Sequence, residues 1–298
     1  PNDLWWRSNG FTTPGAFRLN GKVYLITRGI DEQGVSRLGL AVSADGHSVE
    51  KIFEEPIFVP AGLEQGVENP RVTVMGDQIY MLYTARRGRD RFQLELASIS
   101  NENFLLGLKE GKWESKWRRH DIEFADKSRR DVNDRNAAIF PQKIGSEYIM
   151  YFRDEDLTRT RREIRIAYAN PPDGPWDTGD DTSAVLTPEL LEHRLAQKSE
   201  SPIVWVGVGG PPLLTKDGWF TVFHYVDEDR IYRMGFFIAD RNHPEKIIYL
   251  HDRPIWELGD AYYDLAKSHQ LLAIPRAKVV ATIARRINRF QLAGFIGL

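Results

Sequence analysis

Five stretches of the chain share one pattern, a turn followed by a strand rich in β-branched and aromatic residues. They cover residues 20–28, 76–84, 145–153, 217–224 and 278–285. Each follows a strand that contains or adjoins a proline, at 13–17, 69–72, 138–141, 211–214 and 274–276. Each precedes a third strand, at 37–41, 92–97, 164–168, 232–237 and 290–295. A unit of several strands that recurs about every 60 residues, and cannot bury its faces alone, predicts a β-propeller.

The five repeats predict an all-β fold, a five-bladed β-propeller formed as a single domain by residues 1–298. A β-sandwich is the main alternative, but it does not predict repeats of nearly equal length. One helix is predicted at 187–195, because Thr187 can cap its N-terminus and Pro188 suits the first helical position. The long charged stretch 109–136 predicts a solvated loop or the rim of a pocket.

The composition narrows the classes of partner. The formal net charge of -2 gives no basic excess for nucleic acid, and no apolar run approaches the ~20 residues of a membrane span. The sequence contains neither cysteine nor a His-x-x-x-His pair, so neither a metal nor another cofactor is expected. We expect a cytoplasmic protein and leave homo-oligomer formation open. The aromatic residues Trp5 and Trp6 are candidates for stacking on a sugar ring.

The inner strands of propeller blades converge on one axial depression, so matched positions in successive repeats predict a shared pocket. Basic side chains end the second strand of four repeats, at Arg28, Arg153, His224 and Arg285. Polar clusters adjoin the first strand of two repeats, as Glu68, Asn69 and Arg71 and as Asp134, Arg135 and Asn136. We expect this pocket to bring together Asn69, Arg71, Arg135, Arg153 and His224 and to bind an anion or sugar hydroxyls.

Two common catalytic signatures are absent from the chain. The glycine-rich run 206–212 lacks the Lys-Ser/Thr ending and the following helix of a nucleotide P-loop. It is better explained as backbone that passes close to another group in the pocket. No Gly-x-Ser-x-Gly motif is present, so the sequence does not indicate a hydrolase of the serine-nucleophile type.

Several longer motifs keep one order along nearly the whole chain. They are Pro14-Gly15-Ala16, Ser36-Arg37-Leu38-Gly39-Leu40-Ala41, Gly66-Val67-Glu68-Asn69-Pro70-Arg71-Val72, Ala138-Ile139-Phe140-Pro141-Gln142-Lys143-Ile144 and Gly207-Val208-Gly209-Gly210-Pro211-Pro212-Leu213-Leu214-Thr215. With these motifs the chain resembles glycoside hydrolase family 130. The resemblance implies a five-bladed propeller enzyme that acts on β-mannosides, and the last motif is its most specific part.

Two positions depart from the phosphorylases of that family. The resemblance implies an Asp general acid where this chain has Asn69, and a phosphate-binding His where it has Phe152. An amide cannot supply a proton. These departures favour a glycoside hydrolase that cleaves β-mannosides by single displacement with inversion. Its acid and base would be Glu155 and Glu200, about 6.5–9.5 Å apart to admit a water molecule.

Two alternatives stay open. An inverting β-mannoside phosphorylase would hold inorganic phosphate, its co-substrate, on Arg28, Arg135 and Arg153 and release mannose 1-phosphate. A non-catalytic sugar-binding propeller is suggested by Asn69. In every case the expected ligand is an oligosaccharide. The expected binding residues are Arg28, Glu68, Arg71, Asp134, Arg135, Asn136, Arg153, Asp154 and His224.

Overall fold

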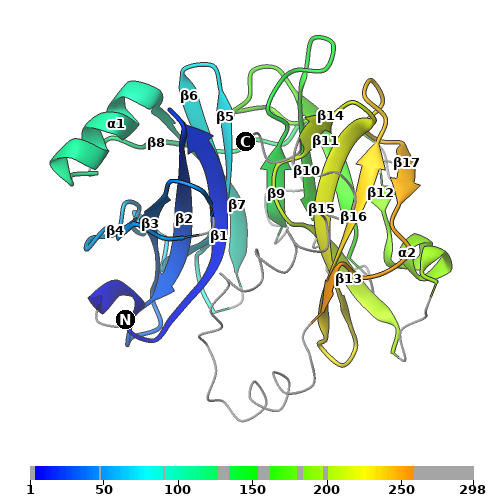
Figure 1. Ribbon diagram of the computed structural model, residues 1–298, viewed down its shortest axis with the longest axis horizontal. Helices are drawn as coiled ribbons and strands as arrows, with labels where there is room; N and C mark the ends of the chain where they lie inside the picture. Colours follow the sequence, from blue (N-terminus) through cyan, green and yellow to red (C-terminus); the bar gives the residue numbers. More distant parts are fainter. Residues whose placement is uncertain are drawn as a thin grey trace.

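The computed structural model describes residues 4–46, 48–89, 91–113, 115–126, 134–153, 162–179, 184–196 and 201–257. Its strands form four antiparallel sheets, which we call blades 1 to 4 in chain order (Figure 1). Blades 1 and 2 lie on the left of Figure 1 and blades 3 and 4 on the right. The chain is therefore an all-β propeller. The fifth repeat expected from the sequence, at 274–295, lies outside the described residues.

Blades 1 and 2 each run from an inner strand outward in chain order. Blade 1 follows the short 3-10 helix η1 (Trp5–Arg7) and contains β1 (Gly10–Leu19), β2 (Lys22–Ile30), β3 (Ser36–Ser43) and β4 (Lys51–Ile52). Blade 2 contains β5 (Gly66–Met75), β6 (Gln78–Arg86), β7 (Phe92–Ser100) and β8 (Arg118–His120), with helix α1 (Asn101–Glu110) between β7 and β8.

Blades 3 and 4 repeat this arrangement. Blade 3 contains β9 (Arg135–Ile139), β10 (Tyr148–Arg153), β11 (Ile164–Ala169) and β12 (Ala184–Leu186), and helix α2 (Pro188–Arg194) follows it. The main path of blade 4 contains β13 (Ile203–Val208), β15 (Gly218–Asp227), β16 (Tyr232–Ala239) and β17 (Ile247–Leu250). Two short strands extend it, β14 (Leu213–Thr215) beside β15 and β18 (Trp256–Glu257) beside β16.

Tight turns fix the register of the innermost hairpins. In blade 1 the pair Leu19 and Lys22 closes a two-residue turn, and its central residues Asn20 and Gly21 have φ of 49° and 78°. Two positive φ values are the requirement of a type I′ turn, whose twist matches that of the strands, and Asn-Gly meets it at low cost. In blade 2 only the first central residue, Gly76, has a positive φ, 61°. A glycine at that position suits a type II′ turn.

Hydrophobic side chains from facing blades form three clusters, between blades 1 and 2, blades 2 and 3, and blades 3 and 4. Edge-to-face aromatic contacts recur in them, such as Tyr24 with Phe104 at 5.1 Å between ring centroids. Trp6 is fully buried in blade 1, where a Cβ on Gly39 would lie 2.0 Å from its ring. The hypothesis that Trp6 stacks on a sugar is therefore wrong, because its ring packs against the sheet.

The helices partly confirm the sequence analysis. Helix α2 begins after Thr187, whose side chain accepts a hydrogen bond from the Leu190 backbone N–H, with Pro188 in the first turn as predicted. Helix α1 was not predicted, although Ser100 caps it and Gly111 ends it in the left-handed conformation. The stretch 109–136 is therefore more than a loop, because it contains the end of α1 and all of β8. The polar composition of this stretch did not indicate these short elements.

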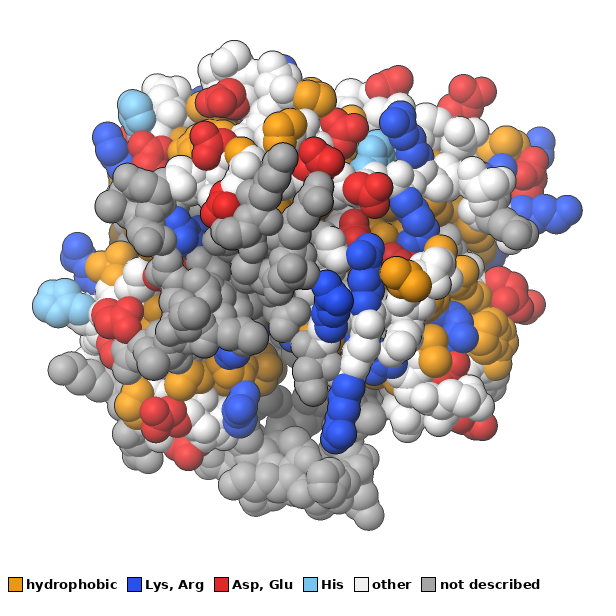
Figure 2. Space-filling model, turned by 180° about the vertical axis from the view of Figure 1, so that it is seen from behind, with side chains coloured by type: hydrophobic (Ala, Val, Ile, Leu, Met, Phe, Trp, Pro, Cys, Tyr) orange, Lys and Arg blue, Asp and Glu red, His pale blue; other side chains and the backbone are white. Residues whose placement is uncertain are grey.

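Charged side chains of both signs are interspersed on the face of the molecule seen in Figure 2, with a group of Lys and Arg side chains to the right of its centre. Across the described part of the chain, no helix is long and apolar enough to cross a membrane. Within the same residues there is no group of three or more His, Cys, Asp or Glu side chains placed to hold a metal ion.

Candidate active site

The inner strands of blades 1 to 3 share an irregularity at matched positions. In β1, β5 and β9 two residues oppose one residue of the neighbouring strand, which is the arrangement of a β-bulge. Each bulge contains a residue with positive φ: Thr13 at 44°, Asn69 at 55° and Asn136 at 51°. Such backbone is unfavourable for most residues, and Asn tolerates it best among those with a side chain. Bulges of this kind redirect side chains near active sites.

Three cross-strand pairs adjoin these bulges, one in each of blades 1 to 3, and a fourth pair lies on the corresponding strands of blade 4. They are Thr12 with Arg28, Glu68 with Thr84, Arg135 with Arg153, and Gly207 with His224, and we call these eight residues the inner ring. Directly paired residues project from the same face of a sheet. The inner strands themselves pack in order, β1 on β5, β5 on β9 and β9 on β13. The register therefore brings the predicted site positions of all four blades to corresponding places.

An ion pair joins blades 1 and 2 within the inner ring. Arg28 Nη2 lies 2.5 Å from Glu68 Oε2, and Arg28 Nε donates to Ser36 Oγ at 2.9 Å. Only 22% of the Arg28 side chain and 8% of the Glu68 side chain are exposed. Burial lowers the pKa of the Arg28 guanidinium, and Glu68 opposes that shift. The carboxylate of Glu68 is thus held in a fixed orientation at the ring.

A second contact joins blades 3 and 4. The amide nitrogen of Asn136 lies 3.5 Å from His224 Nε2, and the His224 ring stacks on Tyr232 with 6.2 Å between centroids. A Cβ on Gly207 would lie 2.7 Å from His224 Cε1. The glycine at 207 is required because the imidazole occupies the space of a side chain. This confirms the prediction that the glycine-rich run passes close to another group.

Guanidinium groups gather around the same two blades. The central carbons of the Arg153, Arg162 and Arg230 guanidiniums lie 5.8, 5.7 and 4.9 Å from the centroid of the Trp205 ring. Arg135, opposite Arg153, lies over the Phe92 ring of blade 2 at 3.6 Å. Aromatic faces are favourable neighbours for these cations. Four guanidiniums in one region provide donors of the kind that bind carboxylate or phosphate oxygens.

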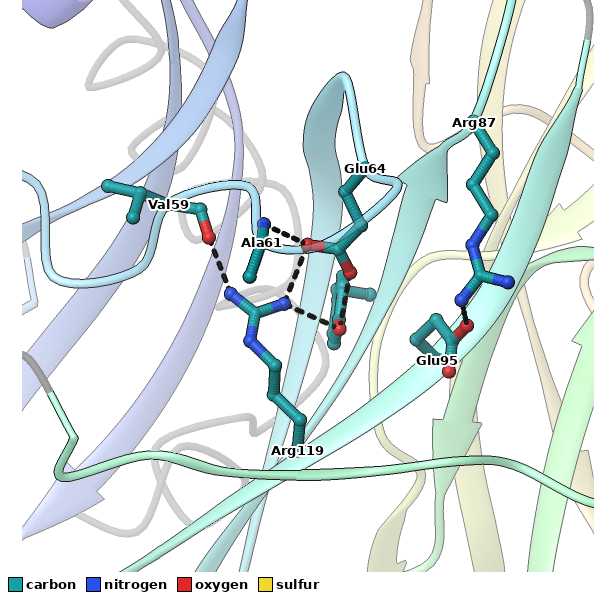
Figure 3. Close-up of polar contacts among 7 residues, drawn as sticks. Val59, Ala61, Glu64, Arg87, Glu95 and Arg119 are labelled. Atoms are coloured by element: carbon teal, nitrogen blue, oxygen red, sulfur yellow. Dashed lines mark hydrogen bonds and ion pairs between the residues drawn. The ribbon is translucent and has the colours of Figure 1, made fainter.

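A buried polar network that the sequence analysis missed lies in blade 2 (Figure 3). Glu64 accepts hydrogen bonds from the Tyr83 hydroxyl at 2.9 Å and from Arg119 Nη1 at 2.7 Å. Arg87 is directed toward Glu95, with which it forms an ion pair. Burial raises the pKa of Glu95 to about 7, even though Arg87 opposes the shift. The signal in the sequence was a single acidic residue within the apolar strand Leu94-Glu95-Leu96.

This network adjoins an open pocket of about 620 Å³, whose lining includes Arg37, Glu64 and Arg86. Arg86 is close enough to the inner ring for its charge to lower the pKa of Arg28. Trp5 is also near this side of blade 1, with 50% of its surface exposed and the Arg37 guanidinium 4.8 Å from its ring. Trp5 therefore stays a candidate for contact with a sugar.

The remaining predicted residues fall into two groups. Arg71 and Asp134 are buried beside the ring, and Arg71 Nη1 donates to the Pro70 carbonyl at 3.0 Å. The candidate carboxylates Asp154, Glu155 and Glu200 lie outside the described residues. Phe152, where the resemblance implies a histidine, is fully buried in the cluster between blades 2 and 3. Its ring faces the hydrophobic core, so this chain uses the position for packing.

The chain is similar to curated proteins and to solved structures. A curated relative, the 1,2-β-oligomannan phosphorylase of Thermoanaerobacter sp. (strain X514), is 29% identical over 262 residues, or 85% of this chain and 76% of the relative. The β-1,2-mannobiose phosphorylase of the same organism is 28% identical over 242 residues, or 80% of this chain and 68% of the relative.

A glycosyl hydrolase from Bacteroides ovatus has a similar fold, with a TM-score of 0.68 and 22% identity, over 86% of this chain and 74% of that chain. The family model described as β-1,4-mannooligosaccharide phosphorylase matches residues 15–259. Because this match spans most of the chain, the protein belongs to glycoside hydrolase family 130 and is an enzyme of carbohydrate chemistry.

Proposed function

We propose that the protein is an inverting β-mannoside phosphorylase, the alternative that the sequence analysis left open. The observation that carries this proposal is the arginine cluster of blades 3 and 4, in which Arg135 and Arg153 face each other across one strand pair. Arg162 and Arg230 add two further guanidiniums around Trp205. Phosphate has two charges and several acceptor oxygens, which suit the donors of such a group. The two phosphorylases among its relatives support the same choice.

In the proposed reaction a phosphate oxygen attacks the anomeric carbon of a β-mannoside. The bond from that carbon to the leaving sugar breaks, and the new carbon–oxygen bond forms on the opposite face, which gives α-mannose 1-phosphate. The leaving oxygen must receive a proton. Arg135 and Arg153 would hold the phosphate in line with the bond that breaks and would balance its charge. Positioning and electrostatic stabilisation of this kind supply a large share of catalysis.

The sugar would lie toward blades 1 and 2. There the Glu68 carboxylate, oriented by Arg28, can accept hydrogen bonds from sugar hydroxyls. Asn69 follows it in the bulge and can donate and accept hydrogen bonds but cannot protonate the leaving oxygen. A residue other than Asn69 and the arginines of the phosphate site must therefore donate the proton. Asp154 and Glu155 directly follow Arg153 in the sequence and are the candidates for it.

The test is incubation with β-1,2- and β-1,4-mannobiose, with and without phosphate. We expect mannose 1-phosphate only when phosphate is present. Free mannose formed at the same rate without phosphate would support the hydrolase hypothesis instead, and Glu155→Gln and Glu200→Gln should then each lose about 10²–10⁴-fold. Binding of mannobiose without any turnover would support the non-catalytic alternative.

A further inference from the structure

A hydrogen-bonded chain of serine, histidine and aspartate lies between blades 2 and 3, away from the inner ring. Ser98 is on β7, His120 ends β8, and Asp173 follows β11 in blade 3. Ser98 pairs with Tyr80 on β6, whereas the inner-ring residue of that strand is Thr84. Four residues of strand separate these positions by about 13 Å. The cluster is therefore distinct from the proposed mannoside site.

The three side chains are connected in the order that activates a serine. Ser98 Oγ lies 2.8 Å from His120 Nε2, and His120 Nδ1 lies 3.4 Å from Asp173 Oδ2. A carboxylate at Nδ1 keeps the proton on that nitrogen, so that Nε2 is free to accept the serine proton. Triads of this kind are recognised by geometry and not by their order in the sequence.

The surroundings favour a neutral imidazole. Only 9% of the His120 side chain is exposed. Burial lowers the pKa of His120, and the charge of Arg118 lowers it further, while Asp173 acts in the opposite direction. Lys116 and Tyr80 also face the pocket. A neutral imidazole is the form that can act as a general base near neutral pH.

The triad borders a pocket large enough for a small ligand. The pocket measures about 440 Å³, within the usual range for small-molecule sites. Its walls carry amides, hydroxyls and cations, including Gln78, Asn103 and Lys116, and its apolar lining residues include Ile99, Pro171 and Pro172. Arg118 is directly opposite Ser98 on the neighbouring strand. If Ser98 adds to a carbonyl carbon, negative charge develops on the carbonyl oxygen, and the Arg118 guanidinium can stabilise that charge.

We propose that Ser98 is an acyl-accepting nucleophile for short-chain esters of polyhydroxylated alcohols, of which an O-acetylated sugar is the simplest case. Ser98 Oγ bonds to the ester carbonyl carbon while its proton passes to His120 Nε2. The bond from that carbon to the sugar oxygen then breaks. The sugar oxygen takes the proton from His120 and leaves as a hydroxyl group. Water repeats the two steps on the acyl-serine, which releases the carboxylic acid and restores Ser98. The polar walls and small volume of the pocket exclude lipid esters.

The first test is covalent labelling with diisopropyl fluorophosphate, a small probe suited to a serine whose residue is only 6% exposed. Mass spectrometry should locate one added diisopropylphosphoryl group on Ser98, absent from Ser98→Ala. His120→Gln should label at least ~100-fold more slowly. The control His193→Gln, an exposed histidine on α2, should label at the wild-type rate. Labelling should also persist in Arg153→Gln, so this result does not depend on the mannoside proposal.

The second test is turnover of 4-nitrophenyl acetate and of mannose penta-acetate. Ser98→Ala should lower both rates to background, while phosphorolysis of mannobiose stays unchanged. The control Ser8→Ala should hydrolyse both esters until it is treated with the fluorophosphate, and should then fall to the same background. Should Ser98→Ala fail to fold, Asp173→Asn at the pocket rim should slow labelling by up to about 10⁴-fold with the melting temperature unchanged. Absence of labelling at Ser98, or a Ser98→Ala protein that melts earlier but hydrolyses esters normally, would overturn the proposal and leave the triad as a link between blades.

Discussion

The two halves of the inner ring differ in how their charged residues are paired. In the half made by blades 1 and 2, Arg28 and Glu68 neutralise each other at 2.5 Å, and their ring partners Thr12 and Thr84 are uncharged. In the half made by blades 3 and 4, Arg135 faces Arg153, and the next pair contributes His224 and a glycine. Aromatic rings of Phe92 and Trp205 support those arginines. Among the ring residues, the first half therefore contains a matched ion pair, and we call it the balanced half. The second contains two facing arginines and a histidine, and we call it the cationic half.

This difference suggests a division of roles. A neutral sugar needs oriented hydrogen-bonding groups, which a fixed ion pair supplies without net charge. A phosphate needs several N–H donors on charged groups, which two facing guanidiniums offer. The same propeller position, near the end of the second strand, carries Arg28 beside a carboxylate in one blade and Arg153 opposite a second arginine in another. Substitutions in each half test this division of roles.

The largest effect is expected from Asn69→Asp, in the balanced half. Asn and Asp have nearly the same shape, and both tolerate positive φ, so the bulge should be kept. A carboxyl group there would provide the proton that the amide cannot. We expect phosphorolysis of mannobiose to rise by about 10²-fold or more. Asn69→Ser, which restores no acid, is the control. An unchanged rate would mean that the acid lies elsewhere and would direct attention to Asp154 and Glu155.

Arg153→Gln tests the cationic half. The substitution removes one guanidinium and leaves Arg135 facing a neutral amide. We expect kcat/KM for phosphate to fall about 100-fold, since a hydrogen bond to a charged group contributes about 1.5–3 kcal/mol. Binding of mannobiose alone, measured by calorimetry, should change little. Arg18→Gln, on an exposed position of β1, should leave both quantities at wild-type values. Equal losses in phosphate and sugar binding would contradict the division of roles.

Glu68→Gln tests the ion pair of the balanced half. The change leaves the largely buried guanidinium of Arg28 without its counter-charge. We expect the free energy of unfolding to fall by about 2 kcal/mol and the melting temperature by about 4 °C or more. Glu50→Gln is a matched control, because the exposed pair of Lys22 and Glu50, 3.9 Å apart, should contribute less than about 0.5 kcal/mol. Similar losses in the two variants would show that the inner-ring pair is not specially coupled to the fold.

The smallest effect is expected for Glu95, which lies on β7 of blade 2 in the balanced half. Its pKa is raised to about 7 from an ordinary value near 4.5, so the folded protein binds more protons than the unfolded chain between these two pH values. The stability contributed by the protonated carboxyl is therefore fully present below about pH 4.5 and lost as the pH rises through 7. We expect Glu95→Gln to flatten this decline by about 1 kcal/mol between pH 5 and 8. Thermal melts across that range measure it, and an unchanged slope would assign the titration to another group.

Local chemistry alone determined much of this protein. The Asn20-Gly21 turn, the capping of α2 by Thr187 and the β-branched and aromatic residues of the second strands are all local features of the sequence, so the repeats and the propeller could be predicted from them. The family motifs also located the ring, because they include Glu68, Asn69 and Gly207. Helix α1 was missed because its cap is ordinary but its stability depends on Phe104 packing between blades.

Other properties were decided only by the tertiary structure. The sequence showed Arg28 and Arg153 as equivalent strand ends, but only the packing of blades placed Glu68 against the first and Arg135 opposite the second. It likewise offered Trp5 and Trp6 as equal candidates, until the glycines of β2 and β3 enclosed Trp6. The contact of Ser98, His120 and Asp173 also joins residues from two blades. Pairings of this kind depend on register and on distances through space, and a linear pattern of residue types does not contain either.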